Sequence, residues 1–171
     1  FKTKVSTPVF RKIAVIGIGL IGSSILHAAH KRGLADILTA SDKSPAVCQR
    51  AIEIDFAGEV TADPAKAVAD ADLVILCVPV GENARVGALI MPHLKSGAII
   101  SDVGSVKGSV LAALEPILRD DVQLVPAHPV AGTEHSGPDA GFANLFDNRW
   151  CILTPPPGTN DEATARVRML W

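Results

Sequence analysis

The sequence predicts an α/β fold built on a doubly wound, mostly parallel sheet. Apolar segments suited to strands alternate with helix-like segments along almost the whole chain, and this alternation is typical of βαβ units. The run 73–78 (LVILCV) is continuously apolar, as expected of a central parallel strand that is covered on both faces. A glycine-rich turn follows the first apolar segment and opens the first helix. Together these features favour a nucleotide-binding sheet over other α/β arrangements.

The elements follow one another in a regular order. The strand 13–16 leads through the turn into a helix that reaches about Gly33, and a second apolar strand covers 37–41. The pattern then predicts helices at 45–54, 64–70, 82–92 and 106–118, and strand-like segments at 59–61, 73–78, 98–101, 122–127 and 149–153. The sequence contains no internal repeat and no low-complexity segment.

The composition excludes several classes of protein. The 171 residues are 48% apolar and 20% charged, which suits one domain with a sizeable core. A net charge of −2 gives no electrostatic reason to expect nucleic acid or an anionic membrane as partner. No apolar run approaches the roughly 20 residues that a membrane helix needs. We therefore expect a small-molecule partner.

The cysteines indicate a reducing compartment. Cys48, Cys77 and Cys151 are widely spaced and odd in number, and no C-x-x-C spacing occurs. This pattern favours free thiols in the cytoplasm over a disulfide framework or a metal site. We expect a cytoplasmic protein without a bound metal.

The glycine-rich turn predicts the binding of a dinucleotide. Its residues, Gly17, Ile18, Gly19, Leu20, Ile21 and Gly22, fit the pattern G-x-G-x-x-G. In that pattern the glycines allow a tight turn, a close approach of the backbone to a pyrophosphate, and close packing of helix on strand. The free N–H groups and the positive dipole end of the helix then point at the phosphates. The alternative interpretation is an ordinary packing turn of a βαβ unit. An acidic residue about 20 positions further along the chain would favour dinucleotide binding over that alternative.

Asp42 ends the second apolar segment 20 residues after Gly22, where a carboxylate can accept hydrogen bonds from a ribose 2′-hydroxyl. A 2′-phosphate would be repelled by this carboxylate, so Asp42 favours NAD over NADP. Lys43 stands next to it and could offset that charge, so NADP stays an alternative.

Two further segments lie at expected carboxyl ends of strands, where ligands of a parallel sheet bind. Val78 and Pro79 leave the strand 73–78, and backbone there could line the nicotinamide ribose or simply end the strand. Ser105 is expected to be the N-cap of the helix 106–118, where its hydroxyl could also face the nicotinamide and the substrate. Lys107 fits the first helical turn poorly, which an anionic partner or exposure to solvent would explain.

His128 is the best candidate for a catalytic base. It directly follows an apolar strand, in a loop of small residues at the predicted ligand edge of the sheet. An imidazole ordinarily titrates near neutral pH, which suits the removal of a proton from a hydroxyl. A purely structural histidine is the alternative. His27, His30 and His93 are expected to be surface or packing residues.

Three segments in this order, GIGLIGSS, DVGSVKG and HPVAGTEHSG, resemble the nucleotide-binding domain of prephenate/arogenate (cyclohexadienyl) dehydrogenases. The resemblance runs from about Lys12 to the end of the chain, and the segment HPVAGTE carries most of its specificity. It implies an NAD(P)-dependent oxidative decarboxylation of prephenate to 4-hydroxyphenylpyruvate, of arogenate to tyrosine, or of both.

The resemblance also implies roles for single residues. His128 would accept the hydrogen bond or proton of the substrate hydroxyl, and Ser105 would position His128 and the nicotinamide. Thr133 and Glu134 would line the substrate side of their loop. The turn 17–22 would cradle the pyrophosphate, and Asp42 would bind the adenosine ribose. Members of this family carry a second, all-helical domain that forms a homodimer and supplies an arginine for the substrate carboxylate.

The end of the chain fits such an arrangement. The cluster 155–158 (PPPG) stops the last strand, and a helix follows from about Asp161 with an apolar stripe that stops at Trp171. A terminal helix that simply ends there is the alternative. We expect an N-terminal extension at 1–11, a Rossmann-type NAD(P)-binding domain at 12–158, and at 159–171 the start of a linker helix to a helical domain outside this chain.

Two rival functions remain open from the sequence. Another nicotinamide-dependent dehydrogenase, of the β-hydroxyacid or pyrroline carboxylate reductase type, would share the nucleotide domain and a helical partner domain. A non-catalytic NAD-sensing module would bind the dinucleotide without turnover.

Overall fold

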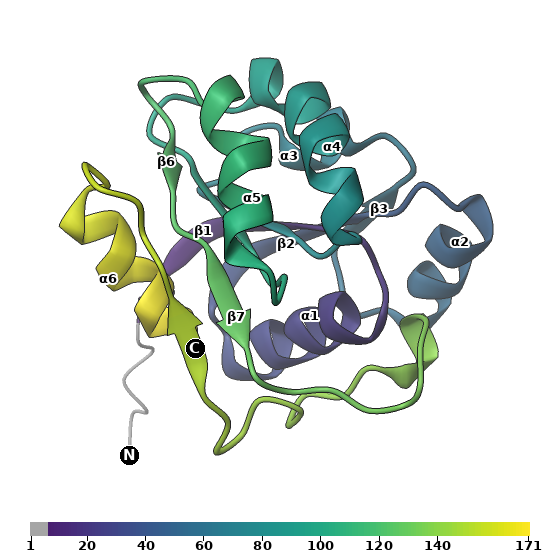
Figure 1. The fold of residues 1–171 in the computed structure, drawn as a ribbon. Helices are drawn as coiled ribbons and strands as arrows, with labels where there is room; N and C mark the ends of the chain where they lie inside the picture. The colour runs from purple at the N-terminus through teal and green to yellow at the C-terminus, as the bar shows by residue number, and fades with distance from the viewer. Residues whose placement is uncertain (1–6) are drawn as a thin grey trace.

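The computed structural model describes residues 7–171 and contains a six-stranded parallel sheet in the order β3-β2-β1-β4-β5-β6 (Figure 1). Its strands are β1 (Phe10–Ile16), β2 (Ala35–Ser41), β3 (Glu59–Thr61), β4 (Leu73–Leu76), β5 (Ile99–Asp102) and β6 (Gln123–Leu124). The helices are α1 (Leu20–Arg32), α2 (Pro45–Ile54), α3 (Pro64–Val68), α4 (Asn83–Ile90), α5 (Lys107–Leu114) and α6 (Asp161–Leu170). The doubly wound, mostly parallel fold predicted from the sequence is confirmed.

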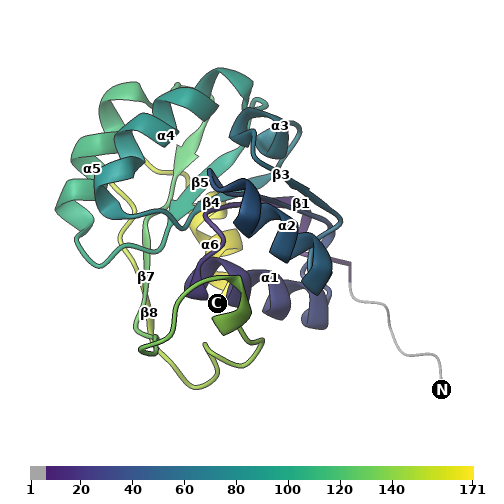
Figure 2. The ribbon, with the colours of Figure 1, turned by 90° about the vertical axis from the view of Figure 1, so that its right-hand side faces the viewer.

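Helices cover both faces of the sheet. The helices α3, α4 and α5 lie on one face, and α1, α2 and α6 lie on the other (Figures 1 and 2). The side chains of β1 alternate between the two layers: Ile13 and Val15 pack toward α1 and α6, whereas Ala14 and Ile16 pack toward α3, α4 and α5. Because residues 13–16 are buried on both faces of the sheet, this part of the strand is continuously apolar rather than alternating.

Local sequence signals set the ends of several helices. In α2 the Ser44 side chain accepts a hydrogen bond from the Val47 N–H, and Pro45 occupies the first turn. Asn160 caps α6 through hydrogen bonds from the N–H groups of Glu162 and Ala163. The bounds predicted for α2 and the start predicted for α6 agree with the structure.

The predicted strand 122–127 is wrong in one respect, because the structure divides it in two. Gln123–Leu124 forms β6 at the edge of the main sheet, and the chain then turns away at Pro126. A proline lacks the N–H that a ladder requires, so it interrupts the strand. The following residues form β7 (Ala127–Pro129), which pairs in antiparallel fashion with β8 (Cys151–Leu153) in a separate two-stranded ribbon.

Other differences are smaller. The strand β1 begins at Phe10, so residues 10 and 11 of the predicted extension belong to the sheet, and residues 1–6 lie outside the described part of the chain. The predicted helix 106–118 is shorter, because α5 ends at Leu114 and a 3-10 turn with Pro116 continues to Ile117. A further 3-10 turn, Val80–Glu82, precedes α4, and another, Met91–His93, follows it. Within residues 7–171, no helix is long and apolar enough to span a bilayer.

The segment 130–150, which joins β7 to β8, runs across α1, the helix that follows the glycine-rich turn. We call this segment the strap. At Gly141 the strap lies so close to α1 that an added Cβ would be 2.1 Å from Ser23 Oγ and 2.9 Å from the Ser23 backbone carbon. The Phe142 N–H donates to Ser24 Oγ at 3.1 Å, and Asp147 forms an ion pair with Arg32 of α1. Asp139, in the 3-10 turn Pro138–Ala140, accepts a bidentate hydrogen bond from Arg50 of α2. The strap is thus tied to α1, which follows the glycine-rich turn, and to α2.

Candidate functional site

A cleft of ≈ 730 Å³ opens where β1, β2, β4 and β5 end. These strands are parallel, so their carboxyl ends share one edge of the sheet, and the sheet order reverses there between β1 and β4. The cleft is lined by predicted cofactor residues from all four loops: Gly17, Ile18, Gly19, Leu20, Ile21, Asp42, Lys43, Val78, Pro79 and Ser105. The topology therefore brings together residues that lie up to 88 positions apart, from Gly17 to Ser105.

The three glycines of the turn differ in what surrounds them. Gly17 has a φ of +99°, and a Cβ there would lie 2.5 Å from the carbonyl oxygen of Cys77. A Cβ on Gly22 would lie 2.0 Å from the carbonyl oxygen of Gly17, so this glycine allows α1 to pack on the strand. A Cβ on Gly19 would meet nothing within 4 Å. The first and third glycines are required by the protein itself, whereas the second leaves the backbone open to a ligand in the cleft.

The start of α1 is suited to an anion. Its N-cap is Gly19, which offers no side chain to the first N–H groups, and the first turn contains no acidic residue. The N-terminal N–H groups and the positive end of the helix dipole then attract a negatively charged group, such as a pyrophosphate. The residues present thus fit a dinucleotide with its phosphates beside Gly19.

Asp42 is held in place by two backbone hydrogen bonds. Its Oδ2 accepts from the Ile18 N–H and its Oδ1 accepts from the Ser44 N–H, both at 2.9 Å. Each carboxylate oxygen can still accept a further hydrogen bond from a ligand hydroxyl. The side chain is therefore fixed at the cleft wall next to the glycine turn, and Lys43 beside it is exposed.

Ser105 lines the same cleft but is not the cap of the following helix, so that prediction is wrong. The helix α5 begins at Lys107, and its N-cap residue is Val106, without a side-chain hydrogen bond. Gly104 and Asp102 shape the turn instead, with the Gly104 N–H donating to Asp102 Oδ2 at 2.8 Å. The exposed Ser105 hydroxyl is consequently free of a capping role.

A buried ion pair connects this turn to the ribbon. Lys107 Nζ contacts Asp102 Oδ2 and also donates to the carbonyl oxygen of Ala127 at 2.6 Å. Asp102, which is 1% exposed, accepts from the Ala127 N–H through its other oxygen at 3.2 Å. Burial lowers the pKa of Lys107, and the hydrogen bond from Lys107 to Asp102 opposes that effect. The anionic partner that would explain Lys107 in the first helical turn is therefore Asp102.

His128 lies in β7, opposite Ile152 of β8, rather than in a loop after the strand. It lines a shallow hollow of ≈ 410 Å³ together with Pro129, Val130, Ala131, Gly132 and Arg149. This hollow is distinct from the cleft at the glycine turn. The structure links the two through the ion pair described above, because Ala127, which Asp102 and Lys107 hold, precedes His128 in the chain.

Thr133 and Glu134 are exposed in the strap beyond this hollow. Thr133 Oγ1 accepts from the His135 N–H at 3.2 Å, and Glu134 Oε1 lies 3.3 Å from His135 Nε2. Neither side chain lines the cleft or the hollow. The structure thus places both on the same segment as His128 without bringing them against it.

Sequence reasoning missed Arg149 in the hollow and Asp102 in the ion pair. Arg149 lines the same hollow as His128 because β7 pairs with β8, and no local pattern predicts that pairing. Asp102 could have been suspected from its position, since it ends an apolar strand shortly before the unexplained Lys107.

The outer face of the ribbon is apolar and exposed. It carries Val130, Trp150 and Ile152, which are 48%, 82% and 51% exposed, and His128 lies in the same ribbon opposite Ile152. The inner side, with Ala127 and Pro129, is buried.

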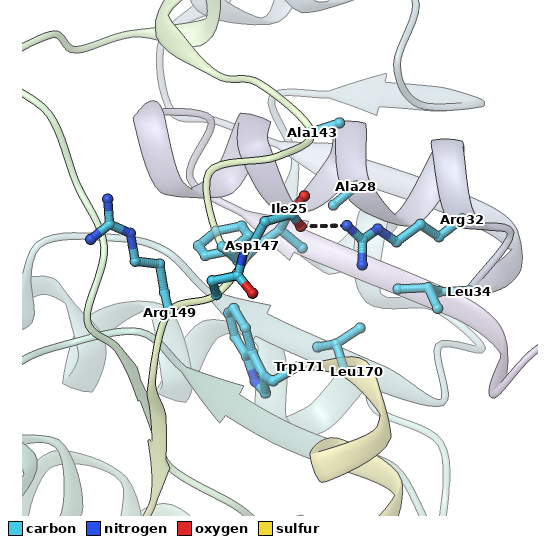
Figure 3. Close-up of a pocket in the computed structure, with 11 residues that line it drawn as sticks. Ile25, Ala28, Arg32, Leu34, Ala143, Asp147, Arg149, Leu170 and Trp171 are labelled. Atoms are coloured by element: carbon cyan, nitrogen blue, oxygen red, sulfur yellow. Dashed lines mark hydrogen bonds and ion pairs between the residues drawn. The ribbon is translucent and has the colours of Figure 1, made fainter.

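A second cavity, of ≈ 380 Å³, lies between α1, the strap and the end of α6 (Figure 3). The Arg32–Asp147 ion pair crosses it, and the Trp171 ring meets Phe146 edge-on with centroids 5.1 Å apart. It is lined by none of the residues predicted for cofactor, catalysis or substrate. We therefore place the candidate site at the cleft and the hollow.

The strand order and the glycine-lined cleft define a dinucleotide-binding domain of the Rossmann type. The family model for the prephenate dehydrogenase, nucleotide-binding domain, matches residues 26–171. The chain belongs to this family, as its sequence motifs predict.

Known proteins of this kind are similar over almost the whole chain. A cyclohexadienyl dehydrogenase of Zymomonas mobilis is 46% identical over 164 residues, which is 95% of this chain and 55% of the relative. The structure of an arogenate dehydrogenase from Synechocystis superposes with a TM-score of 0.85 at 31% identity, over 93% of this chain and 55% of that chain. A prephenate dehydrogenase from Aquifex aeolicus, in complex with hydroxyphenyl propionate and NAD⁺, gives a TM-score of 0.86 at 27% identity, over 99% and 58%. This chain spans about half the length of these relatives.

Proposed function

We propose that the protein is an NAD-dependent oxidoreductase of tyrosine biosynthesis. It would catalyse the oxidative decarboxylation of prephenate to 4-hydroxyphenylpyruvate, of arogenate to tyrosine, or of both. The observation that carries this proposal is a single cleft. It is lined by the open backbone at Gly19, by Asp42 and by Ser105. The family to which the chain belongs supplies the substrate class.

The cofactor residues would be those that line the cleft. Gly17, Ile18, Gly19, Leu20 and Ile21 would hold the pyrophosphate, and Gly22 behind them would let α1 pack close to the turn. Asp42 with Lys43 would face the adenosine ribose, and Val78, Pro79 and Ser105 would line the nicotinamide end. The fixed carboxylate of Asp42 supports NAD rather than NADP, because a 2′-phosphate would meet a negative charge whose oxygens already accept two N–H groups.

The chemistry requires an acceptor for a hydride, and bound NAD supplies it. His128 would accept the proton of the ring hydroxyl while the carbon that bears this hydroxyl loses its hydride. The C–C bond between the ring and its carboxylate then breaks, and carbon dioxide leaves. The electron pair of that bond stays in the ring, which becomes aromatic, and the phenolate oxygen takes up a proton. Ser105 would orient the hydroxyl, and Thr133 and Glu134 would line the substrate side. Because the ring becomes aromatic, orientation and polarisation are the main tasks of the protein.

The substrate would have to reach from the cleft to the hollow of His128. The exposed apolar face at Val130, Trp150 and Ile152 is suited to being covered in the whole protein, since large exposed apolar patches commonly mark contact surfaces. We infer that residues 159–171 begin a linker to a helical domain that covers this face, supplies an arginine for the substrate and forms a homodimer. We also place the enzyme in the cytoplasm, where its three free cysteines would remain reduced.

Turnover assays test the proposal. The full-length protein, with the proposed helical domain, should reduce NAD with prephenate or arogenate, and should do so poorly with NADP as the cofactor or with simple β-hydroxyacids as substrates. Turnover of a β-hydroxyacid without turnover of prephenate or arogenate would favour the β-hydroxyacid dehydrogenase alternative. Binding of NAD without turnover in the full-length protein would favour a sensing module.

Two glycine variants should separate the ligand surface from the packing of the turn. Gly19→Ala adds a methyl group that meets no protein atom within 4 Å, so we expect an unchanged melting temperature and a Kd for NAD raised about tenfold or more. Gly22→Ala places its methyl 2.0 Å from the Gly17 carbonyl oxygen, so we expect a loss of about 1–3 kcal/mol in unfolding free energy. Calorimetric titration and urea unfolding measure the two effects. Equal destabilisation by both substitutions would contradict the division of roles.

A further inference from the structure

The wall of the cleft that follows β4 carries an ion pair. Glu82 ends the 3-10 turn before α4, and Arg85 lies in the first turn of α4. The Arg85 Nε and Nη2 groups both donate to Glu82 Oε2, at 3.0 and 2.6 Å. Both side chains line the same cleft as Asp42 and Lys43. The pair is therefore part of the binding surface rather than of a remote one.

The charges of this region act on one another across the cleft. Hydrogen bonds from Arg85, together with the nearby charge of Lys43, hold the pKa of Glu82 below its usual range. Glu82 is thus ionised at neutral pH and lies within electrostatic reach of the segment that follows Asp42. Two carboxylates, Asp42 and Glu82, and two cations, Lys43 and Arg85, therefore line one cleft, and the charge of Lys43 links the Glu82–Arg85 pair to the end assigned to the adenosine ribose.

An arginine in this position would normally favour a phosphorylated ribose. The guanidinium group binds phosphate through paired N–H donors, and a 2′-phosphate carries about −1.5 to −2 charges at neutral pH. In this structure the Nε and Nη2 donors of Arg85 are directed to Glu82 instead.

We propose that Glu82 is a specificity residue that helps this protein to select NAD over NADP by keeping Arg85 engaged. Asp42 repels a 2′-phosphate directly. Glu82 binds the guanidinium group of Arg85, which would otherwise offset that repulsion by binding the phosphate. The selection against NADP therefore depends on two carboxylates from the segments that follow two different strands, β2 and β4. This inference rests on the proposed function only in that the cleft must bind a nicotinamide dinucleotide.

Binding measurements test the inference without reference to turnover. NAD and NADP are titrated separately into the wild-type protein and into Glu82→Gln, in the absence of substrate. We expect the Kd for NADP to fall about tenfold in the variant, as one released charge-assisted contact would give, while the Kd for NAD changes little. Adding Arg85→Ala to Glu82→Gln should cancel the gain, because the released guanidinium is its source.

A matched control comes from α2. Glu53 forms a similar pair with Arg50, three residues away, and neither residue lines the cleft. Glu53→Gln removes the same charge and should leave the preference for NAD unaltered. An unchanged ratio of the two Kd values in Glu82→Gln would overturn the inference, as would a gain that survives Arg85→Ala. Failure of the wild-type protein to bind either dinucleotide would instead overturn the proposed function along with it.

Discussion

Replacing His128 by asparagine should lower kcat by about 10²–10⁴-fold, the contribution expected of a positioned general base. Asparagine retains a hydrogen-bonding side chain of similar shape but cannot accept the proton of the substrate hydroxyl. The affinity for NAD should hardly change, because His128 lines the hollow beside β7 and not the cleft that contains the glycine turn. Steady-state kinetics with prephenate and arogenate, together with calorimetric titration of NAD, measure both quantities.

A control histidine separates a specific from a general effect. His93 is exposed at the end of the 3-10 turn that follows α4, away from both parts of the site. His93→Asn should therefore leave kcat and the Kd for NAD at their wild-type values. A parallel loss of turnover and of NAD affinity in His128→Asn would identify a structural histidine and refute the assigned role.

Breaking the Asp102–Lys107 pair should be the most damaging change to stability among the charged residues of the site. Lys107→Met leaves the buried carboxylate of Asp102 without its counter-ion, and we expect a loss of about 3 kcal/mol in unfolding free energy. Turnover should fall as well, because the same pair holds the backbone of Ala127 next to His128. Urea unfolding at neutral pH measures the first effect, and kinetics at saturating NAD measures the second.

The double variant shows whether the pair acts as a unit. Asp102→Asn combined with Lys107→Met removes both charges, so its loss of stability should be smaller than the sum of the single losses. Glu53→Gln, which removes a carboxylate from an exposed pair, should hardly change the unfolding free energy. Additive losses in the double variant would mean that the two side chains stabilise the fold independently.

The sequence predicted the parts of the fold and the site that depend on local patterns. Residues 13–16 of β1 and all of β4 are apolar because they are buried on both faces of the sheet. In the glycine turn, Gly17 and Gly22 have no room for a Cβ. These two features predicted the edge of the sheet at which the cleft opens. Asn160, a typical capping residue, likewise indicated the start of α6, where its side chain accepts hydrogen bonds from the Glu162 and Ala163 N–H groups.

The prediction was wrong where contacts with residues elsewhere in the fold override the preference of a local segment for helix or strand. Ser105 has the preferred chemistry of an N-cap, yet α5 begins at Lys107, and the turn before it is held by Asp102, which contacts Lys107 and accepts from the Gly104 N–H. Residues 122–127 read as one strand, but Pro126 and the pairing of β7 with β8 turn the second half out of the sheet. Arg149 and His128 share a hollow through that long-range pairing, which no window of the sequence contains.

The separate ribbon has an evolutionary consequence. The main sheet holds the glycine turn and Asp42, whereas β7 and β8 form their own two-stranded sheet and carry His128. The side chains on the outer face of the ribbon contribute little to the core, so they can be exchanged without disturbing the register of the sheet. Mutation can therefore vary the residues proposed to face the substrate while the residues proposed to hold the cofactor stay unchanged.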